Sequence, residues 1–541
     1  MLGVIPGTIK SGGSRMVKKF SMLALAGLIA LPALASASAG KAPQDLTSKI
    51  DELSRQLDAL KAQLAQQNEA IAQYGDKVDD MDEMLEEKSE SWDLAARIKF
   101  YGDFRARLDY YNADTVFSAG TPMRFDPTSG SFVGVSQGDR SSDTLMTNRF
   151  RLNMRVKATE NVEFKGRLAM YKAWGMQTTP TGLSDGANRG QTFPIFDGSV
   201  TRQPNDSALY VDRAFLNWNN IGGQPIWFSI GRRPTTDGPP AQIRMGSDAR
   251  MATPTAFMDY PFDGLSLGYA YAWGVEAMGT GRIRFCYGRG FENGLQSDYY
   301  SNKLDDTDFA GLSWDVMKKG NRFLTIQSFG VFNLFNYPNF QSDFVNFGAP
   351  ATFGAQMDLG NLYHTTGVYS DKIQNINYFL GAGWSHTDPN GNGFFNDYAA
   401  MFQGLTGPNT DTEDGYSIYV GARYDIDSIG LKLGAEYNYG SQYWVAFTPG
   451  NDDLFQSKLA TRGNAYELYL IYDLPTGEAI SKYAKTFIRL GWQYYDYKYA
   501  GGFDWNMKPY DLSDDKAQLQ ALGINPVESA NQVYLTFEAY F

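Results

Sequence analysis

From residue 97 to the C-terminus, apolar and polar side chains alternate in short segments whose connections are by turns short and long. In the first segment, Phe100, Phe104 and Leu108 fall on one face, and Arg105 and Arg107 fall on the other. A period of two predicts a β-strand with one apolar face. Alternation alone does not separate a soluble sandwich from a membrane barrel, because a sandwich also buries one face of each strand.

The number of segments and the lengths of their connections separate the two folds. An even number of strands, with short turns at one end and long loops at the other, is typical of a transmembrane barrel. The sequence therefore predicts an all-β fold, an antiparallel transmembrane β-barrel of about 16 strands, with both barrel ends on the periplasmic, short-turn side. The predicted strands lie near 97–110, 145–158, 162–174, 208–219, 225–232, 263–272, 281–288, 306–316, 321–333, 357–369, 376–387, 416–425, 430–440, 464–473, 485–498 and 531–541.

The last predicted strand ends the chain on an aromatic residue, Phe541. Val533, Leu535 and Phe537 share its apolar face. A terminal strand of this kind resembles the signal that the barrel-assembly machinery of Gram-negative bacteria recognises. We therefore expect this machinery and outer-membrane lipid to be partners of the chain.

The N-terminus has the pattern of an export signal. Lys18 and Lys19 precede an apolar stretch at 20–34, and A-x-A cleavage sites follow. This arrangement predicts a signal peptide over 1–39, with Met16 as an alternative start of translation. An uncleaved anchor helix is the other interpretation.

A strict heptad follows at 41–90, with apolar residues at nearly every a and d position. This spacing predicts a left-handed coiled coil, which the strand count places in the periplasm. A single helix lying on the barrel or on another protein is the alternative. By analogy with porins we expect a homotrimer. The oligomerisation residues expected in the coil are Ile50, Leu53, Leu57, Leu60, Leu64 and Ile71.

The polar faces of the first three strands are strongly basic. Charged side chains on the lipid face would cost about 2–4 kcal/mol each at mid-depth, so these residues are expected in the lumen. There they would attract anions, or they would pair with acidic residues and brace the wall. The predicted pore-lining residues are Arg105, Arg107, Arg149, Arg151, Arg155, Lys157, Lys165 and Arg167.

The third long loop, 233–262, is the candidate constriction of the pore, because the third loop of general porins folds inward. An ordinary surface loop is the alternative. A loop of mixed charge facing a basic wall would set up a transverse field. Its charged residues are Asp237, Arg244, Asp248, Arg250 and Asp259.

Several segments carry a family resemblance. GDFRAR at 102–107, NRFRLNMRVKA at 148–158, VDRAFLNW at 211–218 and FSIGRRP at 228–234 resemble bacterial porins. More closely, they resemble a family of porin-like proteins with an N-terminal coiled coil from metal- and sulfate-reducing bacteria. The resemblance implies a passive outer-membrane channel.

Composition narrows the function further. The net charge is −12, which argues against nucleic-acid binding, and one cysteine and two histidines leave little for a metal, haem or catalytic centre. We therefore expect no enzyme activity, cofactor or metal. Sixteen strands enclose a water-filled lumen unless loops fill it, so the leading prediction is a porin for small hydrophilic solutes with an anion preference. A structural anchor or tether acting through the coil is the alternative.

Overall fold

The computed structural model describes residues 51–52, 54–66, 69, 97–175, 201–202, 204, 206–233, 237–295, 304–337, 356–448, 453, 457–477, 484–502 and 504–541. The chain divides into two units, residues 1–91 and 92–541. In the first unit, residues 54–66 are helical, and Leu57, Leu60 and Leu64 are more than half exposed. The predicted signal peptide and most of the predicted coil, including Ile50, Leu53 and Ile71, lie outside the described residues. No described helix has the length and apolar character needed to span a bilayer.

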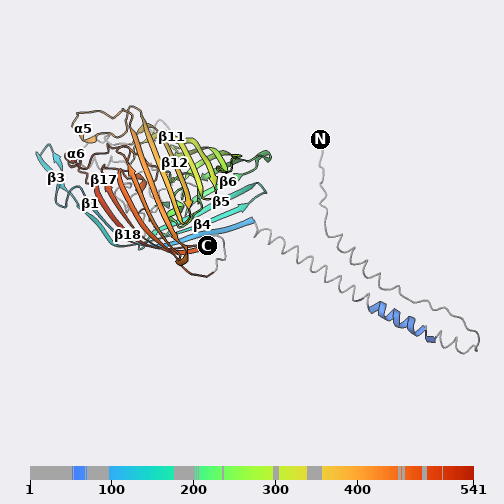
Figure 1. Ribbon diagram of the computed structural model, residues 1–541. Helices are drawn as coiled ribbons and strands as arrows, with labels where there is room; N and C mark the ends of the chain where they lie inside the picture. Colours follow the sequence, from blue (N-terminus) through green and yellow to red (C-terminus); the bar gives the residue numbers. More distant parts are fainter. Residues whose placement is uncertain are drawn as a thin grey trace, which may run out of the picture. The chain divides into compact units, whose positions relative to one another are not determined.

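The second unit is a closed barrel in which neighbouring strands are antiparallel (Figure 1). This confirms the predicted number of strands, and each predicted strand overlaps an observed one. The wall consists of β1 Ile98–Thr115, β4 Arg140–Lys157, β5 Val162–Ala173, β6 Tyr210–Trp218, β7 Ile226–Arg233, β8 Phe262–Ala272, β9 Thr280–Phe291, β10 Thr307–Lys319, β11 Arg322–Phe335, β12 Asp358–Ile373, β13 Ile376–Pro389, β14 Asp414–Ile426, β15 Leu431–Gly440, β16 Gly463–Asp473, β17 Lys485–Tyr497 and β18 Val527–Tyr540.

Short elements lie in the connections. A hairpin in the first long loop was not predicted, because its strands are too short to show a clear period. It consists of β2 Pro122–Asp126 and β3 Ser131–Val135. The helical segments are η2 Ile221–Gly223, α3 Ala241–Arg244, α5 Tyr398–Phe402, η3 Asp427–Ile429, η4 Lys458–Ala460 and α6 Lys516–Ala521.

The two faces of the wall differ in polarity, as strand β1 illustrates. Its residues Asp103, Arg105 and Arg107 are buried in the barrel, whereas Phe100 and Leu108 are exposed on the outside. The other strands continue this exposed apolar surface. A belt of this size is unfavourable in water and matches the hydrocarbon of a membrane. Its members include Leu216, Ile230, Leu267, Leu312, Leu380, Leu468, Leu490, Leu535 and Phe537.

The first and last strands close the barrel around the C-terminus. The backbone N–H of Gly102 donates to the carbonyl of Phe541 at 2.9 Å, and the reverse bond is 3.1 Å long. A Cβ at Gly102 would lie 2.3 Å from the Arg151 carbonyl oxygen and 2.8 Å from the Phe541 ring. Only glycine therefore fits where the terminal ring packs on the first strand.

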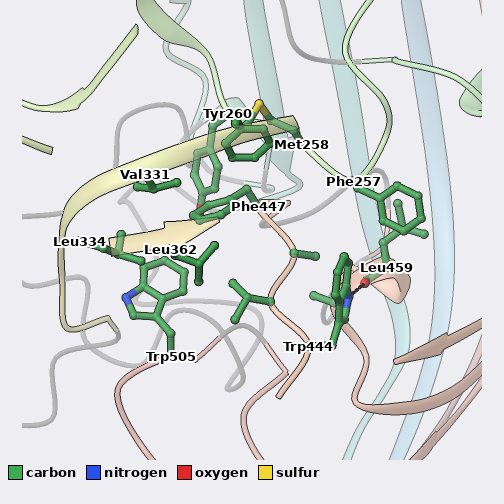
Figure 2. Close-up of a cluster of buried hydrophobic side chains, with 14 of the residues drawn as sticks. Phe257, Met258, Tyr260, Val331, Leu334, Leu362, Trp444, Phe447, Leu459 and Trp505 are labelled. Atoms are coloured by element: carbon green, nitrogen blue, oxygen red, sulfur yellow. Dashed lines mark hydrogen bonds between the residues drawn. The ribbon is translucent and has the colours of Figure 1, made fainter. Parts of the chain in front are cut away.

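Long loops fill part of the lumen with an apolar core (Figure 2). Phe257, Trp444, Phe447 and Trp505 are fully buried there, and they come from three different connections. The indole Nε1 of Trp444 donates to the Leu459 carbonyl at 2.8 Å. The interior is therefore not simply a water-filled tube, since the loops at the long-loop end form a packed core against the wall.

Candidate functional site

The loop between β7 and β8 enters the lumen. At its start, Asp237 Oδ2 lies 2.8 Å from Nη1 of Arg151 on β4 and 3.5 Å from Nη1 of Arg167 on β5. A Cβ on Gly238 would lie 1.8 Å from the Pro254 carbonyl oxygen. The absence of a side chain at Gly238 therefore lets the two arms of the loop approach each other at this wall.

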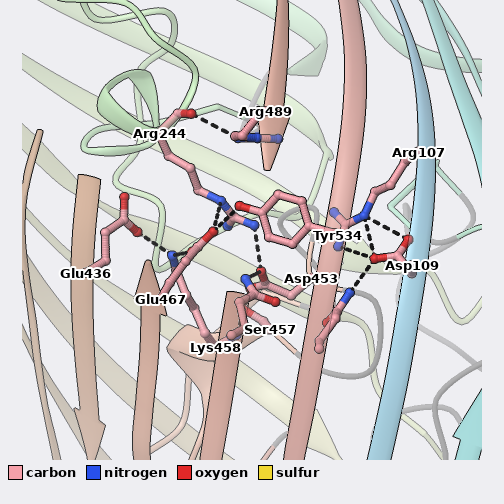
Figure 3. Close-up of polar contacts among 12 residues, drawn as sticks. Arg107, Asp109, Arg244, Glu436, Asp453, Ser457, Lys458, Glu467, Arg489 and Tyr534 are labelled. Atoms are coloured by element: carbon pink, nitrogen blue, oxygen red, sulfur yellow. Dashed lines mark hydrogen bonds and ion pairs between the residues drawn. The ribbon is translucent and has the colours of Figure 1, made fainter. Parts of the chain in front are cut away.

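Further along, the loop contacts a different part of the wall (Figure 3). Arg244, at the end of α3, lies 3.0 Å from Asp453 and 3.0 Å from Glu467 on β16. Its backbone carbonyl accepts a hydrogen bond of 2.9 Å from Nη1 of Arg489 on β17. Arg423 on β14 donates at 2.8 Å to the carbonyl of residue 243. The helical turn is therefore fixed to β14, β16 and β17.

The last charged residues of the loop reach two more sectors. Asp248 pairs with Lys372 on β12 at 2.6 Å and with Arg423 at 2.5 Å. Arg250 lies 3.0 Å from Asp315 on β10. Because β4, β10, β12 and β16 occupy separate parts of the ring, residues 237–250 cross the lumen.

The predicted basic wall faces inward, but much of it is paired with acids. Asp103 binds Arg149 at 3.1 Å and Arg151 at 2.7 Å. Arg107 pairs with Asp109 on its own strand at 2.8 Å. Asp103 faces Arg151 in the register of β1 and β4, whereas Arg107 and Asp109 are two residues apart on one face of β1.

Three of the remaining basic residues also pair with acids. Glu163 lies 2.5 Å from Arg155 and 2.7 Å from Lys165. Arg167 pairs with Asp212 of β6. The Arg105 guanidinium packs 5.3 Å from the Tyr171 ring centre, and Lys157 is exposed at the end of β4. The wall is therefore basic in sequence and largely charge-compensated in the fold.

Burial and nearby arginines set the protonation of Asp237 and Asp259, the first and last acids of the loop. Burial raises the pKa of Asp237, but the nearby Arg151 and Arg167 outweigh it and hold the pKa at about 2. Burial raises the pKa of Asp259 to about 6 against the lowering effect of Arg202, whose Nε lies 2.8 Å away. Asp237 is therefore a fixed negative charge at neutral pH, whereas Asp259 titrates near it.

One buried cluster escaped sequence analysis. Lys458 of η4 pairs with both Glu436 of β15 and Glu467, and the Tyr534 hydroxyl donates to Glu467 at 2.5 Å (Figure 3). Together with Arg244, this gives two cations facing two glutamates inside the barrel. The two-residue period of the sequence indicates only that residues 436 and 467 face the lumen. Their cationic partners come from distant loops, so the pairs could not be inferred.

A cavity of about 770 Å³ lies on the short-turn side of the crossing loop; we call it the vestibule. Seven cations and six carboxylates line it, with both signs present around its wall. The cations are Arg151, Arg167, Arg213, Arg250, Lys372, Lys432 and Lys485, and the carboxylates are Asp103, Asp237, Asp248, Asp425, Asp427 and Asp473. The electric field in the vestibule is therefore strong near individual side chains, and the lining as a whole carries a small net positive charge.

The described residues were also compared with the ligand sets of metal sites. They contain no group of three or more His, Cys, Asp or Glu side chains arranged to hold a metal ion. Cys286 is a free thiol on β9.

A closed antiparallel barrel with an apolar outside and a charged lumen defines a transmembrane β-barrel of the outer-membrane type. The chain belongs to the family described as "Protein of unknown function (DUF3373)", whose model matches residues 139–541. The closer resemblance to porin-like proteins with an N-terminal coil stays a prediction. No curated protein matches the chain.

Solved outer-membrane barrels show a distant likeness. OmpT of Vibrio cholerae is 13% identical, with a TM-score of 0.39, over 82% of this chain and 97% of that one. OmpF of Salmonella typhi, in complex with daunomycin, is 11% identical, with a TM-score of 0.38, over 82% and 97%. OprB of Pseudomonas putida at high pH is 10% identical, with a TM-score of 0.40, over 84% and 96%. These similarities are too low to carry an argument about function.

Proposed function

We propose that the protein is an outer-membrane porin that lets small hydrophilic solutes diffuse passively through the barrel. The observation that carries this proposal is the vestibule, a cavity of about 770 Å³ lined by charged side chains of the wall and the crossing loop. Charged groups lining a narrow passage favour polar solutes and sort them by charge. No enzymatic step is part of the proposal.

The selectivity we propose is a weak anion preference. Seven cations against six carboxylates leave a small positive excess in the vestibule. Because Arg149 and Arg151 are paired with Asp103, they contribute less to attraction of anions than their number implies. The basic wall therefore supports a modest preference and also braces the barrel.

Planar-bilayer recording of the folded full chain tests the proposal. We expect discrete conductance steps and a reversal potential on the anion side in a KCl gradient. Absence of channel activity from correctly folded barrel would contradict the porin. Strong cation selectivity would contradict only the anion preference.

The coil supplies the second candidate function, a tether acting through self-association or envelope attachment. The supporting observation is the described helix at 54–66, whose Leu57, Leu60 and Leu64 are exposed. Deleting 41–90 distinguishes the two functions. A porin would keep conductance and lose oligomer stability, whereas a tether would lose envelope attachment. A homotrimer, recruited through the coil, is the assembly we propose.

A further inference from the structure

The barrel wall has a seam between β9 and β10. Within these two fully described strands, the ladder joins a single pair, Phe291 and Thr307, at the long-loop end. The ladders on either side, β8–β9 and β10–β11, run along the length of their strands. Unpaired backbone groups are costly in hydrocarbon, so a gap in the ladder of a membrane barrel calls for a physical cause.

The cause is a one-residue conflict of register. Arg282 pairs with Asp315 at 2.7 Å, and Arg284 donates to Ser313 at 2.6 Å. These pairs fit a register in which Gly290, not Phe291, would face Thr307. Because a slip of one residue exchanges the two faces of a strand, extending the observed ladder would set lumen-facing residues opposite lipid-facing ones.

Side chains also join the two strands along the seam. The indole Nε1 of Trp273 donates at 2.6 Å to the carbonyl of Val316 on β10. Arg289 and Asp308 pair at 2.9 Å on the outer surface. The one-pair ladder and these side-chain contacts make this junction the least regular of the wall.

A cavity of about 80 Å³ crosses the wall at the seam. Met258 and Phe309 line its inner part, and Leu265 and Leu312 line its outer part. Leu312 is 53% exposed on the membrane side. The volume exceeds the roughly 10–15 Å³ that one water needs, yet it admits only a segment of a single alkyl chain.

Two arginines give this apolar cavity a positive end. Arg233 and Arg284 both line it, and among the described residues Nη1 of Arg233 has no hydrogen-bond partner. Asp315, 3.8 Å from Arg284, is shared with Arg250 and Arg282. One carboxylate facing three guanidinium groups leaves a positive excess that complements an anionic head group.

The short-turn end of the seam lies near the vestibule. A cavity of about 650 Å³ lies at its short-turn end, lined by Arg282 and Asp315. Arg250 lines both this cavity and the vestibule. The second cavity therefore adjoins the vestibule, whereas the seam cavity shares no lining residue with either.

We propose that the seam between β9 and β10 is a lateral opening that binds a long-chain aliphatic carboxylate from the membrane. The alkyl chain lies between Leu265 and Leu312, and the carboxylate binds Arg233 and Arg284. Such a ligand enters the wall from the hydrocarbon and places its head group on the lumen side of the seam. This inference does not depend on ion conduction.

The test uses Cys286, which lines the seam cavity and is the only cysteine of the chain. The folded full chain in phosphatidylcholine vesicles is alkylated with N-dodecylmaleimide, with sodium hexadecanoate or hexadecanol present. We expect hexadecanoate at ten times its dissociation constant to slow alkylation by about tenfold, and the uncharged alcohol to have little effect. Equal protection by both compounds, or protection by neither, would overturn the proposal without any variant.

Variants then test whether Arg233 and Arg284 bind the carboxylate. Arg233→Gln and Arg284→Gln should each abolish most of the protection by hexadecanoate. The matched control is Arg322→Gln, which breaks the pair with Asp371 away from the seam and its cavity and should leave protection intact. Protection that survives in both cavity variants contradicts the assignment of the carboxylate site. A heat-dependent shift of mobility in gel electrophoresis verifies that each variant is folded.

Discussion

Nε of Arg244, in the middle of the crossing loop, lies 3.0 Å from Oε1 of Glu467 on the barrel wall, and both side chains are almost fully buried. Breaking a buried ion pair by removing one partner typically costs about 3–5 kcal/mol, because the other charge is left uncompensated. Here Glu467 keeps Lys458 and Tyr534 as partners, so removing Arg244 should cost less than this free energy at the wall. The loop itself loses its central fixed point.

Arg244→Ala is therefore expected to release the loop while the barrel stays closed. Single-channel conductance should rise, and current noise from loop movement should increase. Arg289→Ala, outside the lumen, serves as the control and should conduct like the wild type. An unchanged conductance in Arg244→Ala would mean that the loop does not limit the passage.

The near balance of charge in the vestibule makes selectivity sensitive to single residues. Lys485→Gln leaves six cations against six carboxylates and should abolish the weak anion preference. Asp427→Asn leaves seven against five and should strengthen it. Reversal potentials in a KCl gradient measure both. Shifts in the same direction for the two variants would rule out the vestibule as the selective region.

The apolar core of the loops should be separable from the stability of the barrel. Trp444 is fully buried and meets the Phe257 ring edge-on, with ring centres 5.8 Å apart. Truncating such a residue costs about 3–5 kcal/mol. Trp444→Ala should make the loops at 237–262 and 441–462 sensitive to protease while the heat-dependent mobility of the barrel persists. Trp218→Ala, on the lipid face, should leave protease resistance unchanged.

The loop between β17 and β18 should respond to pH through Asp504. Burial raises the pKa of Asp504 to about 7, against hydrogen bonds from the backbone of Asn506 and Met507 and the charge of Arg462. A raised folded-state pKa means that the stabilisation is complete below the unfolded pKa of 3.8 and is lost as pH rises through about 7. Protease cleavage within 499–526 should therefore increase between pH 5 and pH 8. Asp504→Asn should be equally resistant at both values, and a variant as pH-sensitive as the wild type would contradict the assignment.

The wall of the barrel could be predicted because it obeys a local rule. Each strand shows a two-residue period, as in Phe100, Phe104 and Leu108. Short turns and long loops alternate from one connection to the next along the chain. The inward direction of Arg149 and Arg151 follows from the same parity. Strand ends were less predictable, since β1 and β4 continue pairing beyond the belt, as far as Ala113 with Arg140.

The interior could not be predicted in the same way, because its contacts join distant parts of the chain. Arg244 and Glu467 are more than 200 positions apart, and no period relates them. The core of Phe257, Trp444 and Trp505 is drawn from three connections whose apolar residues show no regular spacing. The register slip at the seam involves Phe291, whose ring centre lies 5.1 Å from that of Phe335 on β11, and such a contact leaves no periodic signal in the sequence.

The partners of the crossing loop also determine when it can take its place. Residues 237–250 are made before β8, yet their ties to Arg423, Glu467 and Arg489 wait for β14, β16 and β17. Contacts of such long sequence separation form late, because the intervening chain must first be ordered. The loop can therefore reach its final position only after these late strands are in place, and they set the final bore of the barrel.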